Sequence, residues 1–230
     1  MRQSRRLGDQ GADLARAWHL SSAQAATLAK HAKPLAVRRG ELIAHRGAPL
    51  PGVFFLSAGT VKLSLRGPEG EERVLRVVAA GDCFGEPTAL LGNPCLYDAY
   101  ALTDAKLVVV PTNAVFSLLE HDRRFARSLV LALAERSFGI LAEFAAATTQ
   151  RGAQRLAGYI DSLARQNGSR AASVQLPVSK TVVAALLGMK KETLSRLLRQ
   201  FSADGIIGVV RRDIAILDAQ RLSAAARQAR

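Results

Sequence analysis

The stretch that most constrains the fold of this chain is residues 177–207, PVSKTVVAALLGMKKETLSRLLRQFSADGII, near its C-terminal end. Its pattern predicts one helix over about Lys180–Leu187 and a second over about Lys190–Ala203. Ser179 stands where a side chain can cap the first helix, and Gly188 stands where the chain must turn. Two short helices joined by a tight turn form a helix-turn-helix, which places its second helix in the major groove of DNA.

The second of these helices is predicted to have two chemically different faces. The apolar face consists of Leu194, Leu197, Leu198 and Phe201. The polar and basic face consists of Lys191, Glu192, Ser195, Arg196 and Arg199. Such a face suits insertion into a DNA groove, although a merely solvated helix surface has the same composition. We therefore expect the rest of the chain to position and regulate this helix.

Charge is unevenly distributed along the 230 residues, whose formal net charge is +13. Residues 151–230 contain 14 Lys and Arg against 5 Asp and Glu, whereas residues 1–150 contain 18 against 14. An acidic partner is therefore expected at the C-terminal third, and DNA phosphate is the leading candidate. A GC-rich coding background would also make a chain rich in arginine without any such partner.

The N-terminal half changes from helical to β-type sequence at about Leu35. Residues 12–33 are predicted to be helical with a break near Leu20–Ser21, where Ser21 or Ser22 can cap a second helix. From Leu35 onward, short β-type runs alternate with glycines and prolines, which favours an antiparallel barrel or sandwich. The sequence Pro68-Glu69-Gly70 is typical of a hairpin turn between two such runs.

Helical sequence returns after Thr112, with a short helix predicted over Asn113–Glu120 and a long one over about Arg123–Thr148. Apolar or small residues on the long helix alternate at spacings of three and four, as in the seam of a coiled coil. These residues are Val130, Leu133, Ser137, Ile140, Phe144 and Ala147. A second apolar set consists of Leu129, Ala132, Leu141 and Ala145. We therefore expect one side to pack on the chain's own β-domain and the other on a second copy; a helix buried once within a monomer would also show this pattern.

The remaining sequence connects the long helix to the helix-turn-helix and follows it. Thr148–Gly152 is predicted to be a hinge, Ala153–Arg165 a helix and Gln166–Ser173 a polar loop. After residue 205 the sequence IIGVV–RRD–IAILD predicts a hairpin with Arg211 and Arg212 at its tip. A hairpin that follows the second helix makes the C-terminal region a winged helix-turn-helix.

Several classes of protein do not fit this sequence. No apolar run approaches the roughly 18 residues of a membrane span, and the basic N-terminus lacks the apolar region of a secretory signal. Only Cys83 and Cys95 are present, so neither a disulfide framework nor a cysteine-built metal site is expected. No catalytic motif occurs, and Asp82 and Glu86 suit a turn better than acid–base chemistry. We expect a cytoplasmic protein that is not an enzyme and has no membrane partner.

Three motifs in order make the chain resemble the Crp/Fnr family of bacterial transcription regulators from about Leu35 to Leu217. They are VFFLSAGTVKL around Gly59, GDCFGE at Gly85-Glu86, and LLGMKKETLSRLLRQFSADGII. The resemblance implies an α+β fold: an antiparallel β-roll of the cyclic-nucleotide-binding type, a long dimerisation helix and a C-terminal winged helix-turn-helix. The corresponding domains are 1–121 with its flanking helices, 122–150 and 151–230. A homodimer on palindromic double-stranded DNA, with RNA polymerase as a further partner, is implied as well.

The resemblance also assigns DNA contacts, residue by residue. Glu192-Thr193-Leu194-Ser195-Arg196 matches the E-x-x-S-R pattern that reads TTGAT-like half-sites in the Fnr-like branch. Base edges are then read by Lys191, Glu192, Ser195 and Arg196. Phosphates are contacted by Ser179, Lys180, Thr181, Arg199, Arg211 and Arg212. Arginine suits guanine and glutamate suits the cytosine amine, whereas phosphate contacts fix the register without reading sequence.

The match to the family's cyclic AMP chemistry is poor. Cyclic-AMP-binding members pair the cassette glutamate with an arginine about ten residues later, but here Glu86 is followed by Pro87 and no arginine occurs between Arg76 and Arg123. A buried phosphate without a cation would be costly. We therefore expect an effector other than cyclic AMP in a pocket that is apolar apart from Glu86. Its residues are Phe84, Glu86, Leu90, Leu91, Leu96, Ile140 and Leu141.

Several effector chemistries remain open. No cysteine precedes Cys83, so the iron–sulfur chemistry of the oxygen-sensing branch is not expected. The E-T-L-S-R sequence and the wing are closest to regulators of nitrate and nitric-oxide respiration, some of which resemble haem-based gas sensors. Haem would need an axial ligand such as a cysteine or one of the four histidines: His19, His31, His45 and His121. A thiol switch between Cys83 and Cys95, a regulatory module that does not bind DNA, and a constitutive DNA-binding protein without effector are also compatible with the sequence.

Overall fold

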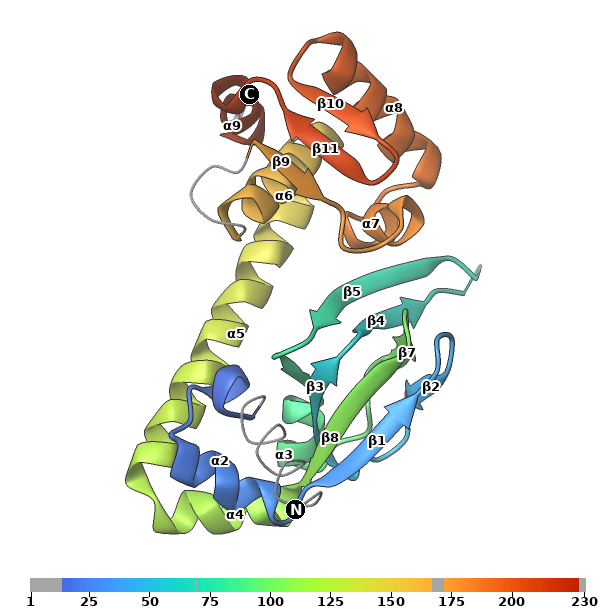
Figure 1. Cartoon of the computed structure of the whole chain (residues 1–230). Helices are drawn as coiled ribbons and strands as arrows, with labels where there is room; N and C mark the ends of the chain where they lie inside the picture. The colour runs from blue at the N-terminus through green and yellow to red at the C-terminus, as the bar shows by residue number, and fades with distance from the viewer. Residues whose placement is uncertain (1–13, 69, 167–171, 228–230) are drawn as a thin grey trace. The chain divides into compact units, whose positions relative to one another are not determined.

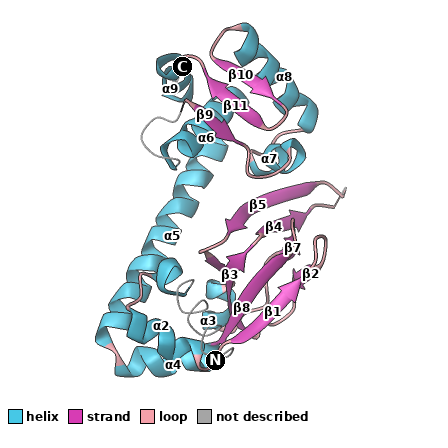
Figure 2. Ribbon diagram, in the orientation of Figure 1, coloured by secondary structure: helices cyan, strands magenta, loops and turns pink. Residues whose placement is uncertain are grey.

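The computed structural model describes residues 14–68, 70–166 and 172–227. The chain forms two compact units, residues 1–138 and 139–230, and the division falls inside one long helix (Figure 1). The first unit combines antiparallel sheets with helices, and the second is mainly helical with a small sheet (Figure 2). The α+β class is therefore confirmed. Residues 12–13, Glu69 and 167–171, which belong to predicted segments, lie outside the described residues.

Two four-stranded antiparallel sheets form the roll in the first unit. One sheet has the order β1-β8-β3-β6 and the other has the order β2-β7-β4-β5. Their strands are β1 Lys33–Val37, β2 Leu42–Ala44, β3 Gly52–Ala58, β4 Thr60–Arg66, β5 Glu72–Ala79, β6 Cys83–Phe84, β7 Asp98–Ala101 and β8 Ala105–Pro111. Since all the pairings of these strands are antiparallel, they need no helical crossovers and follow the short-strand pattern of the sequence.

Strand β3 is apolar along most of its length because both of its faces are covered. Phe54 and Leu56 point into the core between the two sheets, where Phe54 stacks on Phe84 with ring centroids 4.9 Å apart. Val53 and Phe55 point the other way, into a core between the sheet and the helices. A strand buried on both sides shows a continuous apolar run rather than an alternating one.

The corner between β3 and β4 depends on Gly59. Its φ is +93°, and a Cβ there would lie 2.4 Å from the carbonyl oxygen of Asp104. Only glycine combines that backbone conformation with so close an approach. The strand–glycine–strand motif in the sequence thus marks a place where two chain segments touch.

Helices cover the outer face of the β1-β8-β3-β6 sheet. Residues 14–18 are helical, and the labelled helices are α2 Ser22–Ala29, α3 Glu86–Leu91, α4 Thr112–His121 and α5 Arg123–Thr149. Ser21 caps α2 in a reciprocal capping box with Gln24, as one of the two predicted caps. Helix α3 was not predicted. It follows Gly85, whose φ is +90°, and Pro87 lies in its first turn, where the missing N–H costs nothing.

One joint ties α2 to the junction between α4 and α5. The Gln24 amide donates to Asp122 Oδ2 at 2.8 Å, and Asp122 Oδ1 accepts from the backbone amides of Arg124 and Phe125 at 2.8 and 3.0 Å. The carboxylate thus caps the first turn of α5. These contacts, first of all the one from Gln24, lower the pKa of Asp122.

The second unit is built around a helix-turn-helix and a three-stranded sheet of order β10-β11-β9. Its elements are α6 Gly152–Gln166, β9 Ser173–Gln175, α7 Lys180–Leu186, α8 Lys191–Ala203, β10 Ile207–Val210, β11 Asp213–Ile216 and α9 Ala219–Arg227. The predicted hairpin is confirmed as β10 and β11. Strand β9 and helix α9 were not predicted; α9 is held to the unit by Leu222, which is buried.

No helix among the described residues is both long enough and apolar enough to span a bilayer. The apolar clusters instead fill the two compact units. In the first unit, Trp18 lies edge-on to Phe55 with ring centroids 4.8 Å apart and is 6.1 Å from Phe125. Trp18 therefore joins the N-terminal helical segment, the sheet and α5 in a single packing contact.

Replacing Trp18 by alanine should lower the free energy of unfolding by about 3–5 kcal/mol, because a fully buried ring is lost and a cavity remains. Urea unfolding monitored by circular dichroism measures this change. The matched control is Leu91→Ala, whose side chain is 71% exposed and whose loss should change stability by no more than about 0.5 kcal/mol. Equal effects of the two substitutions would contradict the assigned packing.

Candidate functional site

The helix-turn-helix is formed by α7 and α8 through local capping. The Ser179 hydroxyl accepts from the Val182 amide at 3.4 Å and so caps α7, as predicted. After Leu187, Gly188 takes a φ of +61° and reverses the chain direction. Helix α8 then begins at Lys191 and buries one face against the unit. That face consists of Leu194, Leu197, Leu198 and Phe201.

The opposite face of α8 is open. Glu192, Arg196 and Arg199 recur at spacings of four and three and are exposed, whereas Ser195 between them is half-buried. Residues at these spacings lie side by side on one helix face. Lys191 is also exposed. The four predicted base readers are thus gathered on the first half of one helix, on the side away from its core.

A groove of about 440 Å³ runs beside this face. Lys180 from α7, Ser195 and Arg199 from α8 and Val209 from β10 are among the residues that line it. The groove therefore brings a predicted base reader together with two predicted phosphate contacts from different helices. Ser179 and Thr181 are exposed at the start of α7, next to Lys180 in sequence.

The wing presents the remaining two predicted phosphate contacts. Arg211 and Arg212 form the turn between β10 and β11, and both are exposed. Arg211 has a φ of +54°, an uncommon conformation for a residue with a side chain, which the tight turn imposes. Beside the turn, the Gln175 amide donates to Asp213 Oδ1 at 2.8 Å and so ties β9 to the wing.

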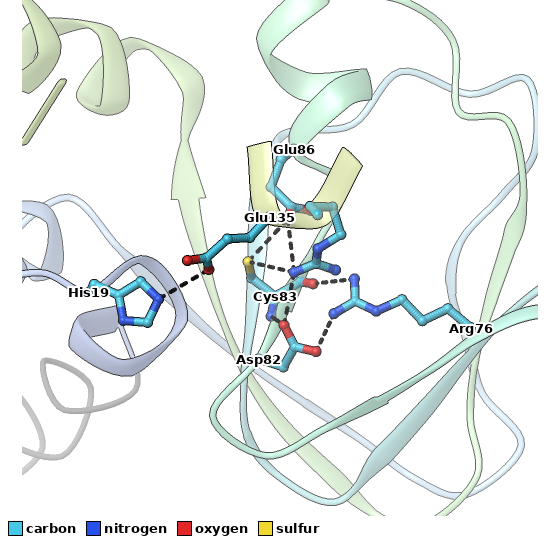
Figure 3. Close-up of polar contacts among 7 residues, drawn as sticks. His19, Arg76, Asp82, Cys83, Glu86 and Glu135 are labelled. Carbon is cyan, nitrogen blue, oxygen red and sulfur yellow. Dashed lines mark hydrogen bonds and ion pairs between the residues drawn. The ribbon is translucent and has the colours of Figure 1, made fainter. Parts of the chain in front are cut away.

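In the first unit, charged side chains gather at the corner that joins β6 to α3 (Figure 3). Arg76 donates to the Cys83 carbonyl oxygen at 2.9 Å and pairs with Asp82. Asp82 Oδ1 also accepts from the Cys83 amide at 2.8 Å, and the Cys83 thiol donates to Glu86 Oε1 at 3.2 Å. Glu86 is only 4% exposed, and burying a carboxyl group is costly unless it is hydrogen-bonded or paired.

Helix α5 reaches this corner through Arg136. Its Nη2 lies 3.0 Å from Asp82 Oδ1, 3.5 Å from Glu86 Oε1 and 4.0 Å from Cys83 Sγ. Arg136 and Arg76 thus face Asp82 and Glu86, two cations against two carboxylates. Sequence reasoning assigned no role to either arginine. The sequence could have indicated Arg136, because its spacing from Leu129 and Leu133 places it on the same face of α5, the face that packs on the roll.

The residues expected to form an apolar effector pocket have different surroundings. Phe84 and Leu90 pack into different core clusters, and Glu86 accepts from the Cys83 thiol and faces Arg136. Leu91, the last residue of α3, and Leu96, in the segment between α3 and β7, are each 71% exposed. Ile140 and Leu141 are also exposed and belong to the second unit. The pocket therefore stays a prediction.

Three of the four histidines named as possible haem ligands contact neighbouring residues. His19 Nε2 lies 3.5 Å from Glu135 Oε2, and both side chains are more than 60% exposed. Figure 3 shows these two side chains facing each other. His45 Nδ1 is bonded to Asp98 Oδ1 at 2.8 Å, and His121 Nδ1 to the Ser117 carbonyl oxygen at 2.7 Å. No group of three or more His, Cys, Asp or Glu among the described residues is placed to hold a metal ion. Haem needs only one or two axial ligands, so haem stays a prediction.

The two thiols are buried and separate. Cys83 lies in the core between sheet and helices, whereas Cys95 lies in the core between the two sheets, and both are free. Burial raises the pKa of Cys83 well above its usual value, and the carboxylates of Glu86 and Asp82 raise it further. Burial also raises the pKa of Cys95. Since the thiolate is the reactive form, neither environment favours a thiol switch.

Helix α5 has the two apolar faces that the sequence predicted. Phe125 and Leu129 are buried in the chain's own core, and Ala132 packs against it. Leu133 was predicted to face a partner, but it also packs on that core. Of the other predicted interface residues, Val130, Ile140 and Phe144 are 66%, 57% and 67% exposed, and Ser137 and Ala147 are exposed as well. A stripe of apolar side chains on α5 is thus left uncovered within one chain.

Comparison with known proteins identifies both parts of the chain. A cyclic nucleotide-binding domain matches residues 34–122, and a Crp-like helix-turn-helix domain matches residues 154–225. Transcriptional regulator SdrP of Thermus thermophilus is 30% identical over 80% of this chain and 90% of its own. A CRP-like cAMP-activated global transcriptional regulator of Mycobacterium tuberculosis is 26% identical over 88% of this chain and 92% of its own.

Solved structures agree on the fold. FixK2 from Bradyrhizobium japonicum superposes with a TM-score of 0.76 over 86% of this chain and 99% of its own, at 24% identity. The roll, long helix and helix-turn-helix therefore define a two-domain bacterial regulator. The chain belongs to the Crp/Fnr family of transcription regulators.

The burial of both cysteines leads to a test with a thiol reagent. At pH 9 an ordinary thiol, with a pKa of about 8.5, is mostly thiolate, but Cys83 and Cys95 should react with Ellman's reagent at least about tenfold more slowly than in urea. Cys83→Ser and Cys95→Ser each leave one thiol and separate the two rates. Fast reaction of either native thiol would show that its burial is not maintained in solution.

Proposed function

We propose that this chain acts as a homodimer that reads a TTGAT-like palindrome and is controlled by an effector other than cyclic AMP. The observation that carries the DNA-reading part is the exposed face of α8, opposite its buried side and beside a groove. In a helix-turn-helix this second helix enters the major groove. We propose that residues 1–121 form the sensor domain, residues 122–150 the dimerisation helix and residues 151–230 the DNA-binding domain.

The side-chain chemistry of the exposed α8 face suggests which residues could read bases. Arg196 can donate two hydrogen bonds to guanine O6 and N7, and Glu192 can accept one from a cytosine amine. Ser195 is half-buried at the groove and can adapt to either type of base. Lys191, at the start of α8, can approach an adjacent base. We infer that these four residues read a half-site resembling TTGAT.

Phosphate contacts would come from the edges of this surface. Ser179, Lys180 and Thr181 lie at the start of α7, Arg199 lines the groove, and the wing carries Arg211 and Arg212. Residues 151–230 have nearly three times as many cationic as anionic side chains. Such contacts fix the register on the duplex and make binding fall with added salt.

A second copy of the chain would cover the open stripe on α5. Val130, Ile140 and Phe144 are large, apolar and more than 50% exposed, and single soluble chains seldom leave such a contiguous surface in water. A symmetric pair of α5 helices would bury the stripe and present two copies of α8. Two recognition helices roughly 34 Å apart read half-sites one helical turn apart, which is a palindrome. RNA polymerase is the further partner that the family implies.

The charged corner that joins β6 to α3 supports an effector other than cyclic AMP. Arg76 and Arg136 are each engaged by Asp82, and Arg136 also by Glu86, so a phosphate would have to compete with carboxylates already in place. The two thiols are buried and free, and the raised pKa of Cys83 does not suit redox sensing. Haem, for which one of the histidines or a cysteine would supply an axial ligand, remains a candidate effector group. A second candidate is a constitutive DNA-binding protein, which the self-paired corner favours.

Arg196→Ala should weaken binding to a duplex with a palindrome of two TTGAT half-sites one helical turn apart by about 1–3 kcal/mol and relax the preference at one base position. Fluorescence anisotropy with the palindrome, single-base variants and a scrambled duplex measures both effects. Arg212→Ala is the control: it should weaken binding to all duplexes equally and reduce the salt slope by about one. If Arg196→Ala behaves like Arg212→Ala, Arg196 contacts phosphate. If wild type does not prefer the palindrome, the proposed specificity is wrong.

Phe144→Glu should weaken dimerisation by about 2 kcal/mol or more, because it places a charge in the centre of the proposed seam. Sedimentation velocity over a range of concentrations measures the monomer–dimer equilibrium. Leu217→Glu is the matched control, since Leu217 is 63% exposed and lies outside α5. A wild-type chain that sediments as a monomer, or equal effects of the two substitutions, would contradict an α5 interface.

A further inference from the structure

Arg155 of α6 holds the ends of two other helices. Its Nε donates to the Leu187 carbonyl oxygen at 2.9 Å, and its Nη1 donates to the Gln150 carbonyl oxygen. Leu187 is the residue that ends α7, and Gln150 directly follows the last residue of α5. A single guanidinium therefore bridges the end of the long helix and the turn of the helix-turn-helix.

The bridge is favourable for a simple physical reason. The last carbonyl groups of a helix have no partner within the helix, and the helix dipole places partial negative charge there. Arg155 provides directed N–H donors and a positive charge to two such ends at once. A lysine has one small charged group and cannot match both carbonyls with the fixed fork of an arginine.

Both helix ends also make local hydrogen bonds. At the end of α5 the Gln150 amide donates to the Ala146 carbonyl oxygen at 3.0 Å. At the end of α7 the Leu187 amide donates to the Val183 carbonyl oxygen and the Met189 amide to that of Ala184, both at 2.9 Å. What Arg155 adds is a connection between the two ends.

The same two places also lie close together at Gly152. A Cβ on Gly152, in the first turn of α6, would lie 3.5 Å from Met189 Cε and 3.6 Å from Leu197 Cδ1. Met189 belongs to the turn between α7 and α8, and Leu197 is buried in α8. The backbone just after α5 thus passes near the recognition helix, with space for about one methyl group between them.

We propose that Arg155 is the positioning residue that couples the end of α5 to the orientation of α8. This role of Arg155 rests on the proposed DNA-reading function and names the residue through which DNA reading is controlled. Movement at the break between α5 and α6 passes through Arg155 to the Leu187 carbonyl and from there to the turn that starts α8. Arg155 itself touches no DNA.

Arg155→Met tests this assignment because it keeps the aliphatic stem and removes both hydrogen bonds. Arg165→Met is the matched control: it removes the same charge from the same helix, where Arg165 is exposed and pairs only locally with Asp161. Binding is measured by anisotropy with the palindrome and a scrambled duplex, well below the melting temperature of each variant. Arg155→Met should bind the palindrome at least about tenfold more weakly than Arg165→Met does.

Comparing how the two variants bind the two duplexes distinguishes a positioning role of Arg155 from a direct DNA contact and from a loss of folding. A positioning role predicts that binding to the scrambled duplex and the salt slope stay equal in the two variants, and that Arg155→Lys recovers only part of the loss. Equal palindrome binding by Arg155→Met and Arg165→Met would overturn the proposal. So would a salt slope that falls by about one in Arg155→Met alone, which marks a phosphate contact.

Hydrogen exchange makes the proposal testable even if the chain proves not to prefer the palindrome. Arg155→Met should speed exchange in peptides covering both the α5–α6 break and the α7–α8 turn, whereas Arg165→Met should leave both unchanged. Faster exchange at only one of the two places would show that Arg155 caps a single helix end and couples nothing. Loss of palindrome preference by wild type, with coupled exchange intact, would overturn the proposed specificity but not the role of Arg155.

Discussion

Burial of one face of α5 against the roll is the interaction on which the rest of this chain depends. Phe125 and Leu129 enter the core formed by Trp18 and Phe55, and this contact fixes which way the helix is rotated about its axis. The rotation in turn decides that Arg136 meets the corner of the roll and that Val130 does not. A single packing contact therefore determines both the electrostatic contact and the surface left for a partner.

The corner at Gly85 combines a tight backbone turn with a buried carboxylate. Both Gly85, with its positive φ, and buried Glu86 lie in the part of the chain that the cyclic nucleotide-binding domain matches. Here the charges are balanced within the chain, because Asp82 lies between two arginines and Glu86 faces one of them. Buried charges are tolerated only when they are paired, so a ligand for this corner must either bring its own compensation or leave the pairs intact.

Much of the fold could be predicted from the sequence because it depends on local patterns. Helical periodicity located α5 and α8 to within a residue or two, and the cap at Ser179 and the turn at Gly188 follow from local backbone preferences. Strand β9 and helix α9 were missed because they are short, and tertiary contacts hold them: β9 pairs with β11, and α9 is anchored by Leu222. Helix α3 was missed because it has only 6 residues.

The polar cluster could not be predicted because its members are distant in sequence. Asp82 and Arg136 are separated by 54 residues, and only the folded roll brings them together. The surroundings of the expected pocket residues could not be predicted, because apolar type alone does not say which side of a short loop faces inward. The predicted base readers could be placed on one face because a single helix carries them, and the spacing along one helix is a local property.

The length of α5 makes the helix a lever. Thirteen residues separate Arg136 from Thr149, which is about 20 Å of helix at 1.5 Å per residue. A tilt of about 10° at Arg136 would displace the C-terminal end of the helix by about 3.4 Å. A small change in the ion pairs of Arg136 would therefore become a displacement of several ångströms at Thr149.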